Sequence, residues 1–545
     1  MSFRKRSAVT SVAAAAIVMA GTVAHPPLSE PAEAHSGEVT SAAGKGERSR
    51  GELPLGPSDL PEKRTTRQLR PGVTLTQIDR GAPSSSVRWV VELSIPPSSN
   101  PDPDAPGRAV QDKRSADALV TRLRDAGFAS RAQPVRQPAV ADVEAGVIGH
   151  RVRLTTTHRN KEGADAAVAR LKEAGFSARS WYAGWDGGTK TRGHWSVNVV
   201  TIDPRRFRGH LGGTHGGDLE QRETTTELAR STGATAAVNG GFFTMDPAAG
   251  AEGDPAGVGV YEGRVTSEPV GDRPAIVLQR NARRTAVTRP TWDAAIRLDR
   301  RTVELDGTNR VPGLIRNCGG DASDTPTSLP LHDVTCRDSS ELVSFDPSFG
   351  EQTPSGTGTE VVLDRSGRVV RVLDSRGTTL QRGQTSIQGI GRKGSLLASL
   401  EVGDRPRLRE RVDIGAPRTR GTTVVNGGPE LLRHGREHIT QARDGMRQLD
   451  NPSFDYGWVL QRNPRTIAGV DAKGRTVLVT VDGRQPDQLG LSLPEAAAVA
   501  RSLGMRAAIN LDGGGSTAMA VRGRLITDPS DAAGERPVGD AITVR

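Results

Sequence analysis

The stretch Ala507-Ala-Ile-Asn-Leu-Asp-Gly-Gly-Gly-Ser-Thr517 carries the strongest structural signal in the chain. A short apolar run ends in two polar residues, Asn510 and Asp512, which are two positions apart. On a strand both side chains leave the same face, while Leu511 points into the core. Glycine after a strand permits unusual backbone angles, and the run Gly513–Gly515 costs too much chain entropy to serve stability alone. We therefore expect free backbone amides here that form an anion-binding nest.

The same motif, an apolar strand followed by Asn or Asp and then by glycine, occurs three more times, and we call each copy a corner. The other copies are Ala-Ala-Val-Asn-Gly-Gly-Phe-Phe at 236–243, Val-Val-Asn-Gly-Gly-Pro at 424–429 and Val-Leu-Val-Thr-Val-Asp-Gly-Arg at 477–484. Any one such corner is usually a hairpin turn. Four together predict a shared polar pocket. In these three further corners, the candidate site residues are Asn239, Gly240, Gly241, Asn426, Gly427, Gly428, Asp482 and Arg484.

These corners belong to a long C-terminal region, residues 194–545, in which alternation typical of strands dominates. Helices are few. One is expected near 224–231 and another at 492–503, where Ser492 and Glu495 form a capping box and Gly504 ends the helix. The region is therefore predicted to be a mixed, strand-rich α+β domain.

An internal repeat precedes it within residues 85–185. Ala118–Phe128 matches Ala166–Phe176, and each copy ends in Arg-Leu, two residues, and Ala-Gly-Phe. Both matching stretches are expected to be helices, and a strand-like segment precedes each of them. The segment of residues 85–185 is therefore predicted to adopt a split βαβ fold in the order βαββαβ. It resembles the SPOR (sporulation-related repeat) domain, and that resemblance implies binding to cell-wall glycan. Trp181 and Tyr182 could stack on sugar rings. The alternative is that these aromatic residues belong to the core.

The N-terminus has the pattern of a secretory signal peptide. Arg4, Lys5 and Arg6 precede an apolar run that reaches Ala24, and small residues allow cleavage after Ala24 or Ala34. An uncleaved anchor is the alternative. Residues 1–34 are thus expected to be the signal peptide, and residues 35–84, rich in Pro, Gly, Ser, Glu and Arg, a flexible linker. No later segment is apolar enough to span a membrane.

Composition narrows the class of protein. The 545 residues include 73 Lys and Arg against 63 Asp and Glu, which gives a net charge of +10, and 64 Gly and 35 Pro are spread without a repeat. This excludes collagen, a coiled coil and a wholly disordered chain. The positive charge comes with no basic helix or interleaved aromatic surface, so no nucleic-acid partner is expected.

The two cysteines, Cys318 and Cys336, flank a polar loop. In an exported protein this arrangement favours a disulfide over a metal site or a catalytic thiol, since no metal-ligand spacing accompanies them. His194, His210 and His215 do not form a metal-ligand pattern either. We expect no metal and no cofactor, although oxygen-rich corners of this kind would suit Ca²⁺ or Mg²⁺.

The corner blocks, in their order, resemble the phosphodiester glycosidase family, with a catalytic domain like that of N-acetylglucosamine-1-phosphodiester α-N-acetylglucosaminidase over residues 194–545. The resemblance rests on the four corners and on Arg465-Thr-Ile-Ala-Gly469, and Arg222-Glu-Thr224 and Arg536–Ile542 also fit the pattern. It implies hydrolysis of the bond between a sugar's anomeric carbon and a phosphodiester oxygen.

That chemistry assigns expected roles. A carboxylate must act as nucleophile or base, for which Asp512 is preferred over Asp482. Arg465 and Arg484 are candidate phosphate clamps. The alternatives are a salt bridge for Arg465 and a turn-capping role for Asp482. The residues expected to hold the sugar, together with the corner glycines, are Asn239, Asn426, Asn510, Ser516 and Thr517.

The leading hypothesis is an exported, cell-wall-associated hydrolase whose partner is wall glycan or a sugar-phosphodiester polymer, with no stable membrane insertion after signal cleavage. The alternative is a non-catalytic envelope protein that binds polysaccharide or peptidoglycan.

Overall fold

The computed structural model describes residues 51–96, 108–298, 301–316, 325–327, 334–448 and 450–545. The chain divides into two units, Met1–Gly46 and Glu47–Arg545, and the features below belong to the second. The proposed signal peptide, the first part of the predicted linker and Cys318 lie outside the described residues. Cys336 is buried on a strand, and its disulfide stays a prediction.

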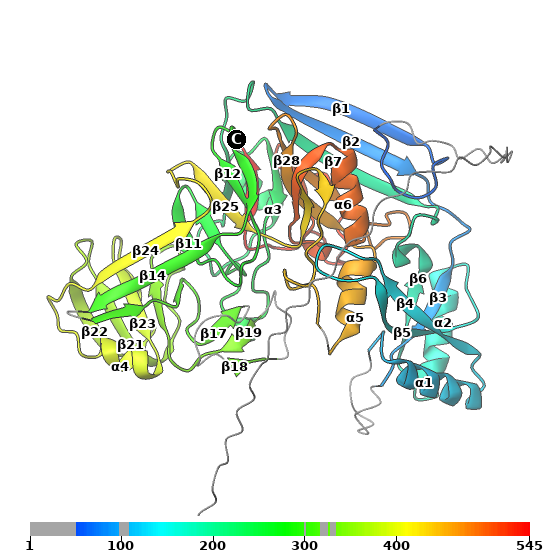
Figure 1. Cartoon of the computed structure of the whole chain (residues 1–545), viewed down its shortest axis with the longest axis horizontal. Helices are drawn as coiled ribbons and strands as arrows, with labels where there is room; N and C mark the ends of the chain where they lie inside the picture. The colour runs from blue at the N-terminus through cyan, green and yellow to red at the C-terminus, as the bar shows by residue number, and fades with distance from the viewer. Residues whose placement is uncertain (1–50, 97–107, 299–300, 317–324, 328–333, 449) are drawn as a thin grey trace, which may run out of the picture. The chain divides into compact units, whose positions relative to one another are not determined.

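An eight-stranded sheet forms the centre of this second unit (Figure 1). Its inner strands are rich in Val, Ile, Leu and Thr and are largely buried on both faces. One face packs against helix α6 in a large apolar core, and the other faces a second core. In spatial order the strands are β1 (Glu62–Arg70), β2 (Val73–Gly81), β7 (His194–Ile202), β29 (Thr476–Val481), β28 (Arg465–Asp471), β30 (Met505–Asn510), β26 (Glu430–Arg433) and β27 (Arg436–Glu437).

The predicted flexible linker is wrong for residues 62–81. These residues form the hairpin β1–β2, and β2 pairs with β7 along nine positions from Val73↔Ile202 to Gly81↔His194. Leu75 and Ile78 are buried. The polar composition that suggested a linker belongs mainly to β1, an exposed edge strand whose charged side chains are typical of such edges.

Two five-stranded sheets pack beside the second core. One has the order β32 (Arg524–Leu525), β31 (Met519–Val521), β9 (Ala236–Asn239), β33 (Ala541–Val544) and β8 (Leu211–Thr214). The other has the order β11 (Arg264–Ser267), β10 (Gly259–Tyr261), β25 (Thr422–Asn426), β12 (Ala275–Gln279) and β13 (Thr285–Thr288).

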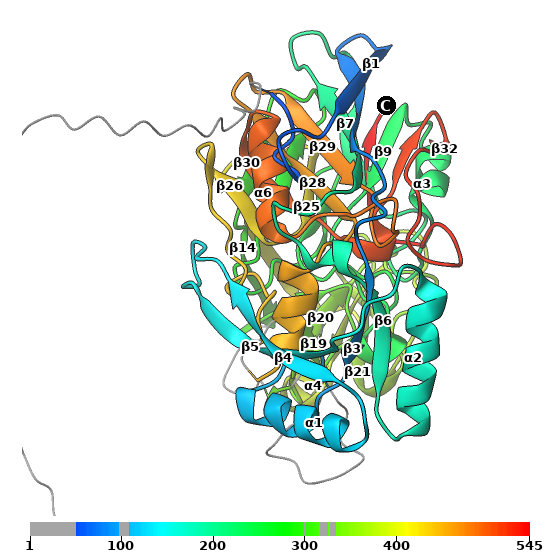
Figure 2. The same cartoon turned by 90° about the vertical axis from the view of Figure 1, so that its right-hand side faces the viewer.

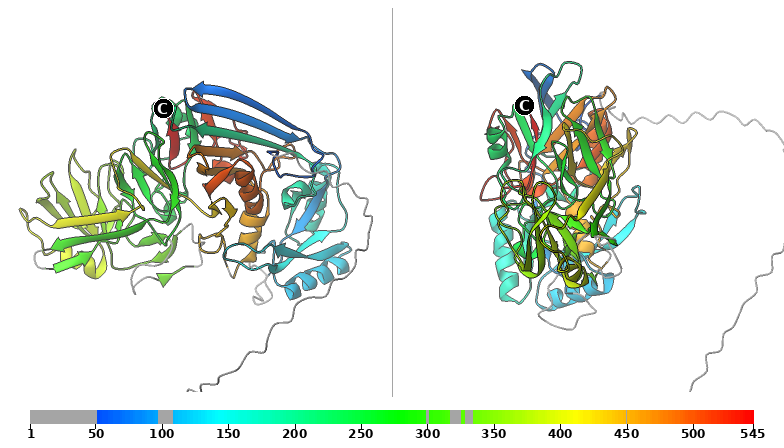
Figure 3. Two further views of the ribbon diagram at one scale, coloured as in Figure 1. Left: turned by 45° about the horizontal axis from the view of Figure 1, so that its top comes forward. Right: turned by 90° about the vertical axis from the view of Figure 1, so that its left-hand side faces the viewer.

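A lobe with its own apolar core is inserted between β13 and β25, and is drawn green to yellow in Figure 3. Its first sheet has the order β15 (Arg301–Glu304), β14 (Thr291–Leu298) and β24 (Arg407–Asp413). Its second has β16 (Gly307–Thr308), β20 (Leu342–Phe345), β23 (Thr385–Gly389), β21 (Gly356–Leu363) and β22 (Val369–Arg376). Its third has β17 (Leu314–Arg316), β19 (Val334–Arg337) and β18 (Thr325–Pro326).

The repeat segment forms an antiparallel four-stranded sheet with helices α1 and α2 packed on it (Figure 2). Along the chain its elements are β3 (Trp89–Leu93), α1 (Lys113–Asp125), β4 (Ser130–Gln137), β5 (Gly146–Leu154), α2 (Lys161–Glu173) and β6 (Ala178–Tyr182). The strand order is β4-β5-β3-β6. We call residues 85–186, including the short turn η1 (Ala183–Asp186), the repeat module. Its resemblance to the SPOR domain stays a prediction.

The remaining helices are α3 (Thr225–Ser231), α4 (Gly391–Leu397), α5 (Pro452–Asp455), which continues into the π-helical turn η3 (Tyr456–Leu460), and α6 (Leu493–Ser502). Thr224 and Ser492 cap α3 and α6 through the capping-box hydrogen bonds, and both expected helices of this region are confirmed. The mixed, strand-rich α+β class is confirmed as well. Within the described residues, no helix combines the length and the apolar character that a membrane crossing requires.

Candidate active site

Three of the four polar corners meet at one edge of the central sheet. They are joined by backbone hydrogen bonds: the Asp512 N–H donates to the Gly240 carbonyl (3.2 Å), and the Gly428 N–H donates to the Asn510 carbonyl (2.8 Å). The Asn510 N–H in turn donates to the Pro429 carbonyl at 3.0 Å. The turns after β9, β25 and β30 therefore pack against one another, although they are far apart in sequence.

The fourth corner, Asp482, leaves the sheet at the same edge. Strands β29 and β30 both run antiparallel to β28, which lies between them. They are therefore parallel to each other, and their C-terminal ends, followed by Asp482 and Asp512, emerge together. Two strand spacings separate them, or about 10 Å. The four corners thus bring two carboxyl groups to one edge of the sheet.

Two of the residues predicted to bind the sugar, Asn239 and Asn426, instead form hydrogen bonds that hold the fold together. Asn239 is fully buried: its Nδ2 donates to the Asp512 carbonyl (2.8 Å), and its Oδ1 accepts from the Thr466 hydroxyl (2.6 Å) and the Ala518 N–H (3.1 Å). Asn426 exchanges two hydrogen bonds with the backbone of Phe242, at 3.1 and 3.2 Å. Their amides are occupied by the fold, so the expected sugar contacts of Asn239 and Asn426 are wrong.

Asn510 is also tied to the backbone, but only on one side. Its Nδ2 donates to the carbonyls of Gly428 (3.0 Å) and Leu511 (2.7 Å). Its Oδ1 is buried and has no hydrogen-bond partner, and neither has the Thr517 hydroxyl. An acceptor and a hydroxyl therefore remain at this corner for a ligand or a water molecule.

The predicted anion-binding nest at Gly513–Gly515 is mostly closed. The Gly513 N–H donates to the Asp512 carboxylate (2.8 Å), and the Gly514 N–H donates to the Pro464 carbonyl (2.9 Å). The N–H groups of Ser516 and Thr517 turn back onto the glycine carbonyls at 3.2 Å each. These four amides are not free to bind an anion.

The glycines have another function, which is to make room for two arginines. Gly514 has φ +60°, and a Cβ atom there would lie 3.1 Å from both terminal nitrogens of Arg484. A Cβ atom on Gly515 would collide with the guanidinium of Arg536 and with Asp531. The lack of side chains thus lets two guanidinium groups lie against the backbone next to Asp512.

Arg484 is the better placed of the two predicted clamps. Its Nε and Nη2 donate to Asn463 Oδ1 at 3.0 and 2.9 Å, which fixes the guanidinium without neutralising it. Burial, and then the charge of Arg536, lower the pKa of Arg484. Its backbone has φ +61°, an unfavourable angle for a residue with a side chain. Arg484 is thus a strained, fixed cation at the edge of the site.

Arg465 is less suited to bind phosphate directly. It is buried, and its Nε and Nη2 donate to the backbone carbonyls of Leu491 (3.0 Å) and Trp458 (2.5 Å). Burial, and then the charge of Arg484, lower the pKa of Arg465 to about 9. The Arg465 side chain therefore holds two backbone segments together. These contacts are neither those of a phosphate clamp nor those of the salt bridge that was the alternative.

The two carboxyl groups have different proton affinities. Burial raises the pKa of Asp512 to about 6, against the opposing effects of Ser516, the Gly513 N–H and Arg536. Burial, together with the negative charge of Asp528, raises the pKa of Asp482 to about 8. At neutral pH Asp512 is therefore mainly ionised and Asp482 mainly protonated. Such a divergence between neighbouring carboxyl groups is typical of an acid–base pair.

Arg536 and Asp540 are site residues to which sequence reasoning gave no role. Arg536 forms an ion pair with Asp531 at 2.6 Å and lies close to Gly515. Asp540 accepts hydrogen bonds from the Gly241 N–H (2.8 Å) and the Tyr261 hydroxyl (2.7 Å), and burial raises its pKa to about 6. The segment Arg536–Ile542 fits the family pattern, but its position in the sequence does not reveal that Arg536 lies close to Asp512.

The repeat module contacts the segments that hold Arg484. The Trp185 indole N–H donates to the Gln485 carbonyl (3.2 Å), and the Trp185 carbonyl accepts from the Arg462 N–H (2.8 Å). Gln485 follows Arg484, and Arg462 precedes Asn463, which fixes the Arg484 guanidinium. The Arg462 side chain also donates to the Gly184 carbonyl at 2.7 Å.

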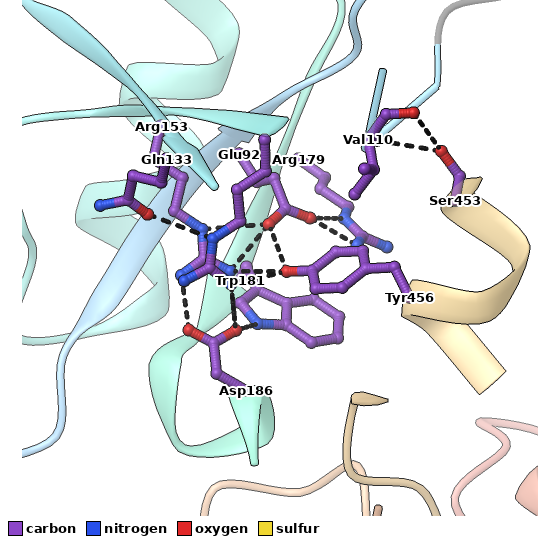
Figure 4. A network of polar contacts seen from close by, with 10 residues as sticks. Glu92, Val110, Gln133, Arg153, Arg179, Trp181, Asp186, Ser453 and Tyr456 are labelled. Carbon is purple, nitrogen blue, oxygen red and sulfur yellow. Dashed lines mark hydrogen bonds and ion pairs between the residues drawn. The ribbon is translucent and has the colours of Figure 1, made fainter. Parts of the chain in front are cut away.

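A buried polar network joins the same module to η3 (Figure 4). Glu92 accepts from Arg153 (2.7 Å), Arg179 (2.6 Å) and the Tyr456 hydroxyl (2.9 Å). Arg153 also pairs with Asp186 at 2.6 Å. Each charge in this network has a partner of opposite sign, as burial requires.

Both residues of the predicted sugar-stacking surface make contacts within the protein. Tyr182 is only 4% exposed and packs against Trp89 and Trp185, so for Tyr182 the prediction is wrong and the core alternative holds. Trp181 is half-buried: its indole N–H donates to Asp186 (2.9 Å), and the Arg179 guanidinium lies 4.4 Å above its ring. One face of that ring is therefore already covered.

Within the described part of the chain, no group of three or more His, Cys, Asp or Glu side chains is placed to hold a metal ion. The three histidines have separate partners: His194 contacts the Asp487 carbonyl, His210 contacts Arg545, and His215 packs against Tyr261. The absence of a metal requirement stays a prediction.

Comparisons with known proteins agree with this geometry. The sequence profile of the phosphodiester glycosidase family matches residues 357–545. A Burkholderia pseudomallei K96243 crystal structure, described only provisionally as an exported protein, is 32% identical with a TM-score of 0.79, and the match covers 90% of this chain and 98% of that one. N-acetylglucosamine-1-phosphodiester α-N-acetylglucosaminidase of Bos taurus is 37% identical over 110 residues, 20% of either chain.

The match thus spans about a fifth of the length of that curated relative. A hypothetical protein from Synechocystis, at 17% identity and a TM-score of 0.50, covers 89% of this chain and is similar in fold alone.

Proposed function

We propose that the chain hydrolyses sugar-1-phosphodiesters at the anomeric carbon, since its residues 357–545 match the profile of the phosphodiester glycosidase family. The observation that carries the proposal is the pairing of a fixed cation with two buried carboxyl groups of unlike proton affinity. Arg484 lies against Gly514, next to Asp512, and Asp482 leaves the same edge of the sheet. A substrate that is both a glycoside and an anion suits this combination.

In the proposed reaction, Arg484 and Arg536 neutralise the phosphate, since guanidinium groups bind phosphate oxygens through paired N–H donors. Ionised Asp512 takes a proton from the water molecule that attacks the anomeric carbon. The bond between that carbon and the phosphodiester oxygen breaks. Asp482, protonated at neutral pH, gives its proton to the departing oxygen. A phosphate is already a competent leaving group, so Asp482 contributes less than Asp512.

The test is the variant Asp512→Asn, assayed for release of reducing sugar from a simple alkyl phosphodiester of N-acetylglucosamine 1-phosphate. Loss of a general base predicts that kcat falls by about 10³. Asp374→Asn on the exposed strand β22 is the matched control, because it makes the same substitution outside the site. The control should retain wild-type turnover. Near-normal turnover by a folded Asp512→Asn variant would remove Asp512 from the mechanism.

We also propose that the protein is exported and acts on wall-associated glycopolymers. The basic and apolar N-terminal pattern supports export, and so does the similarity to the B. pseudomallei protein. The SPOR resemblance of the repeat module supports binding to wall glycan, through a surface other than the buried ring of Tyr182. Fractionation of the expressing cells, followed by a pull-down on purified wall glycan, tests both parts. Retention of the full-length chain inside the cell would contradict export.

A further inference from the structure

A groove lies at the opposite end of strand β30 from Asp512. This groove has a volume of about 430 Å³, within the range of small-ligand sites. We call it the arginine groove. It is lined by Arg289, Glu430, Arg433, His434 and Arg506, with Val287, Thr288 and Ala507 between them.

The arginines of the groove are fixed to different degrees. Arg289 is held by both oxygens of buried Asp444, at 2.7 and 3.1 Å, and Arg433 forms two hydrogen bonds with Glu430. Arg506 is exposed, and no carboxylate pairs with it within the described residues. Three guanidinium groups facing two carboxylates leave a net charge of +1, which matches the single negative charge of one phosphodiester group.

The hairpin turn beside Arg506 is rigid. His434 and Gly435 join β26 to β27 with φ +53° and +81°, both in the left-handed region that a type I′ turn requires. The Gly435 N–H donates to the Arg506 carbonyl at 2.7 Å. Histidine stands where Asn or Gly is usual, and its exposed ring lines the groove. The backbone hydrogen bond between Gly435 and Arg506 thus connects this turn to the strand that carries Arg506.

The lining favours a sugar phosphate over a nucleic acid. Arginines can hold the phosphate while the Glu430 carboxylate accepts hydrogen bonds from sugar hydroxyls. No Phe, Tyr or Trp lines the groove, although aromatic stacking platforms are the usual means of binding single-stranded nucleic acid.

Its position connects the groove to the active site. Arg506 and Asp512 are six residues apart on and just beyond one extended strand, or about 20 Å. We propose that the arginine groove is a second, non-catalytic subsite that holds one phosphodiester group of a polymeric sugar-phosphate chain while another unit lies between Asp512 and Asp482. This inference rests on the proposed function, and it specifies the substrate as a polymer.

The test compares Arg506→Ala with Arg501→Ala, which removes the same charge from the exposed face of α6, where Arg501 pairs with Glu437. The probes are a hexamer of N-acetylglucosamine 1-phosphate units and the single-unit phosphodiester. In Arg506→Ala, the ratio of the hexamer KM to the single-unit KM should rise about fivefold. In Arg501→Ala the ratio should stay at the wild-type value.

A binding measurement separates this inference from the proposed function. Labelled hexamer is titrated into full-length Asp512→Asn protein, with and without Arg506→Ala. Weaker binding in the double variant supports the subsite even if neither probe is hydrolysed. Equal binding by the two proteins overturns it, as does an equally tight complex with a single-stranded oligonucleotide of the same charge.

Discussion

Asp512 and Asp482 owe their unlike proton affinities to different surroundings. Both are buried, but Asp512 accepts the Gly513 N–H and lies near the positive Arg536, whereas Asp482 faces negative Asp528 and has one oxygen without a partner. The first carboxyl group therefore ionises at lower pH than the second. This difference has consequences for both the rate and the stability of the protein.

For the rate, kcat/KM should follow a bell-shaped pH profile. Activity needs ionised Asp512, so it falls as the pH drops through about 6. It also needs protonated Asp482, so it falls as the pH rises through about 8. Initial rates measured across this range in wild type and in Asp482→Asn check the assignment. The variant should lose the alkaline limb, and an unchanged limb would exclude Asp482 as the acid.

For stability, the direction follows from proton linkage. The pKa of Asp482 rises from 3.8 to about 8 on folding, so between these values the unfolded chain is ionised while the folded chain keeps its proton. Stability therefore decreases as the pH rises through this window. Asp482→Asn removes this loss of stability. The Tm difference between the variant and the wild type should therefore be about 4 °C larger at pH 8 than at pH 5. Thermal melts at both pH values decide; an equal gain would contradict the raised pKa.

At the scale of elements, the turn η1 is attached to the loop that carries Arg484. The Trp185 N–H donates to Gln485, and the backbone and side chain of Arg462 are held by Trp185 and Gly184. The repeat module thus reaches the proposed phosphate clamp through hydrogen bonds. Loss of one of them should weaken substrate binding more than the chemical step.

Trp185→Phe keeps an aromatic ring but removes the donor to Gln485. We expect KM for the single-unit phosphodiester to rise about threefold to tenfold, with kcat nearly unchanged. Trp181→Phe is the matched control, because its indole N–H donates to Asp186 within the module. Equal KM values for the two variants, measured by steady-state kinetics, would show that Trp185 does not position Arg484.

How far the sequence predicts these elements depends on how local their signals are. The ends of helices α3 and α6 were predictable within a residue or two because their capping signals are local. The Thr224 and Ser492 side chains each accept a hydrogen bond from the backbone N–H three residues later. The hairpin β1–β2 was not predictable, since its stability comes from pairing with β7, more than a hundred residues later. A polar, Gly-rich segment has the same composition whether or not it finds such a partner.

The same limit applies to the site residues. The Asn/Asp–glycine corners indicated where polar side chains would gather. They could not show that the amides of Asn239 and Asn426 are used by the fold, because their partners, Thr466, Ala518 and Phe242, come from other segments. The glycine run suggested an anion nest, whereas its purpose became visible only with Arg484 and Arg536 in place.

At the scale of the whole molecule, the repeat module and the central sheet share one apolar core. Trp89, Leu119 and Leu171 of the module belong to the same buried cluster as Trp195 and Leu493. The charged network around Glu92 and Tyr456 lies at the same junction (Figure 4). A tethered binding domain would have a separate core, so this module is structurally part of the same folded unit as the central sheet.

The two parts should therefore unfold together. In urea, tryptophan fluorescence, to which Trp89, Trp181 and Trp185 of the module contribute, should change over the same concentration range in which activity is lost. Removal of the Glu92 hydrogen bond in Tyr456→Phe should lower both midpoints by the same amount. A module transition well separated from the loss of activity would contradict a shared core.

The shared core also bears on how such a protein can evolve. A domain on a flexible tether can be exchanged by recombination, because the cut exposes little apolar surface. Here a crossover between Asp186 and His194 would divide the apolar cluster that the module shares with the central sheet. Inheritance of both parts as one unit is the expected result, in keeping with a bacterial counterpart that aligns over nine-tenths of this chain.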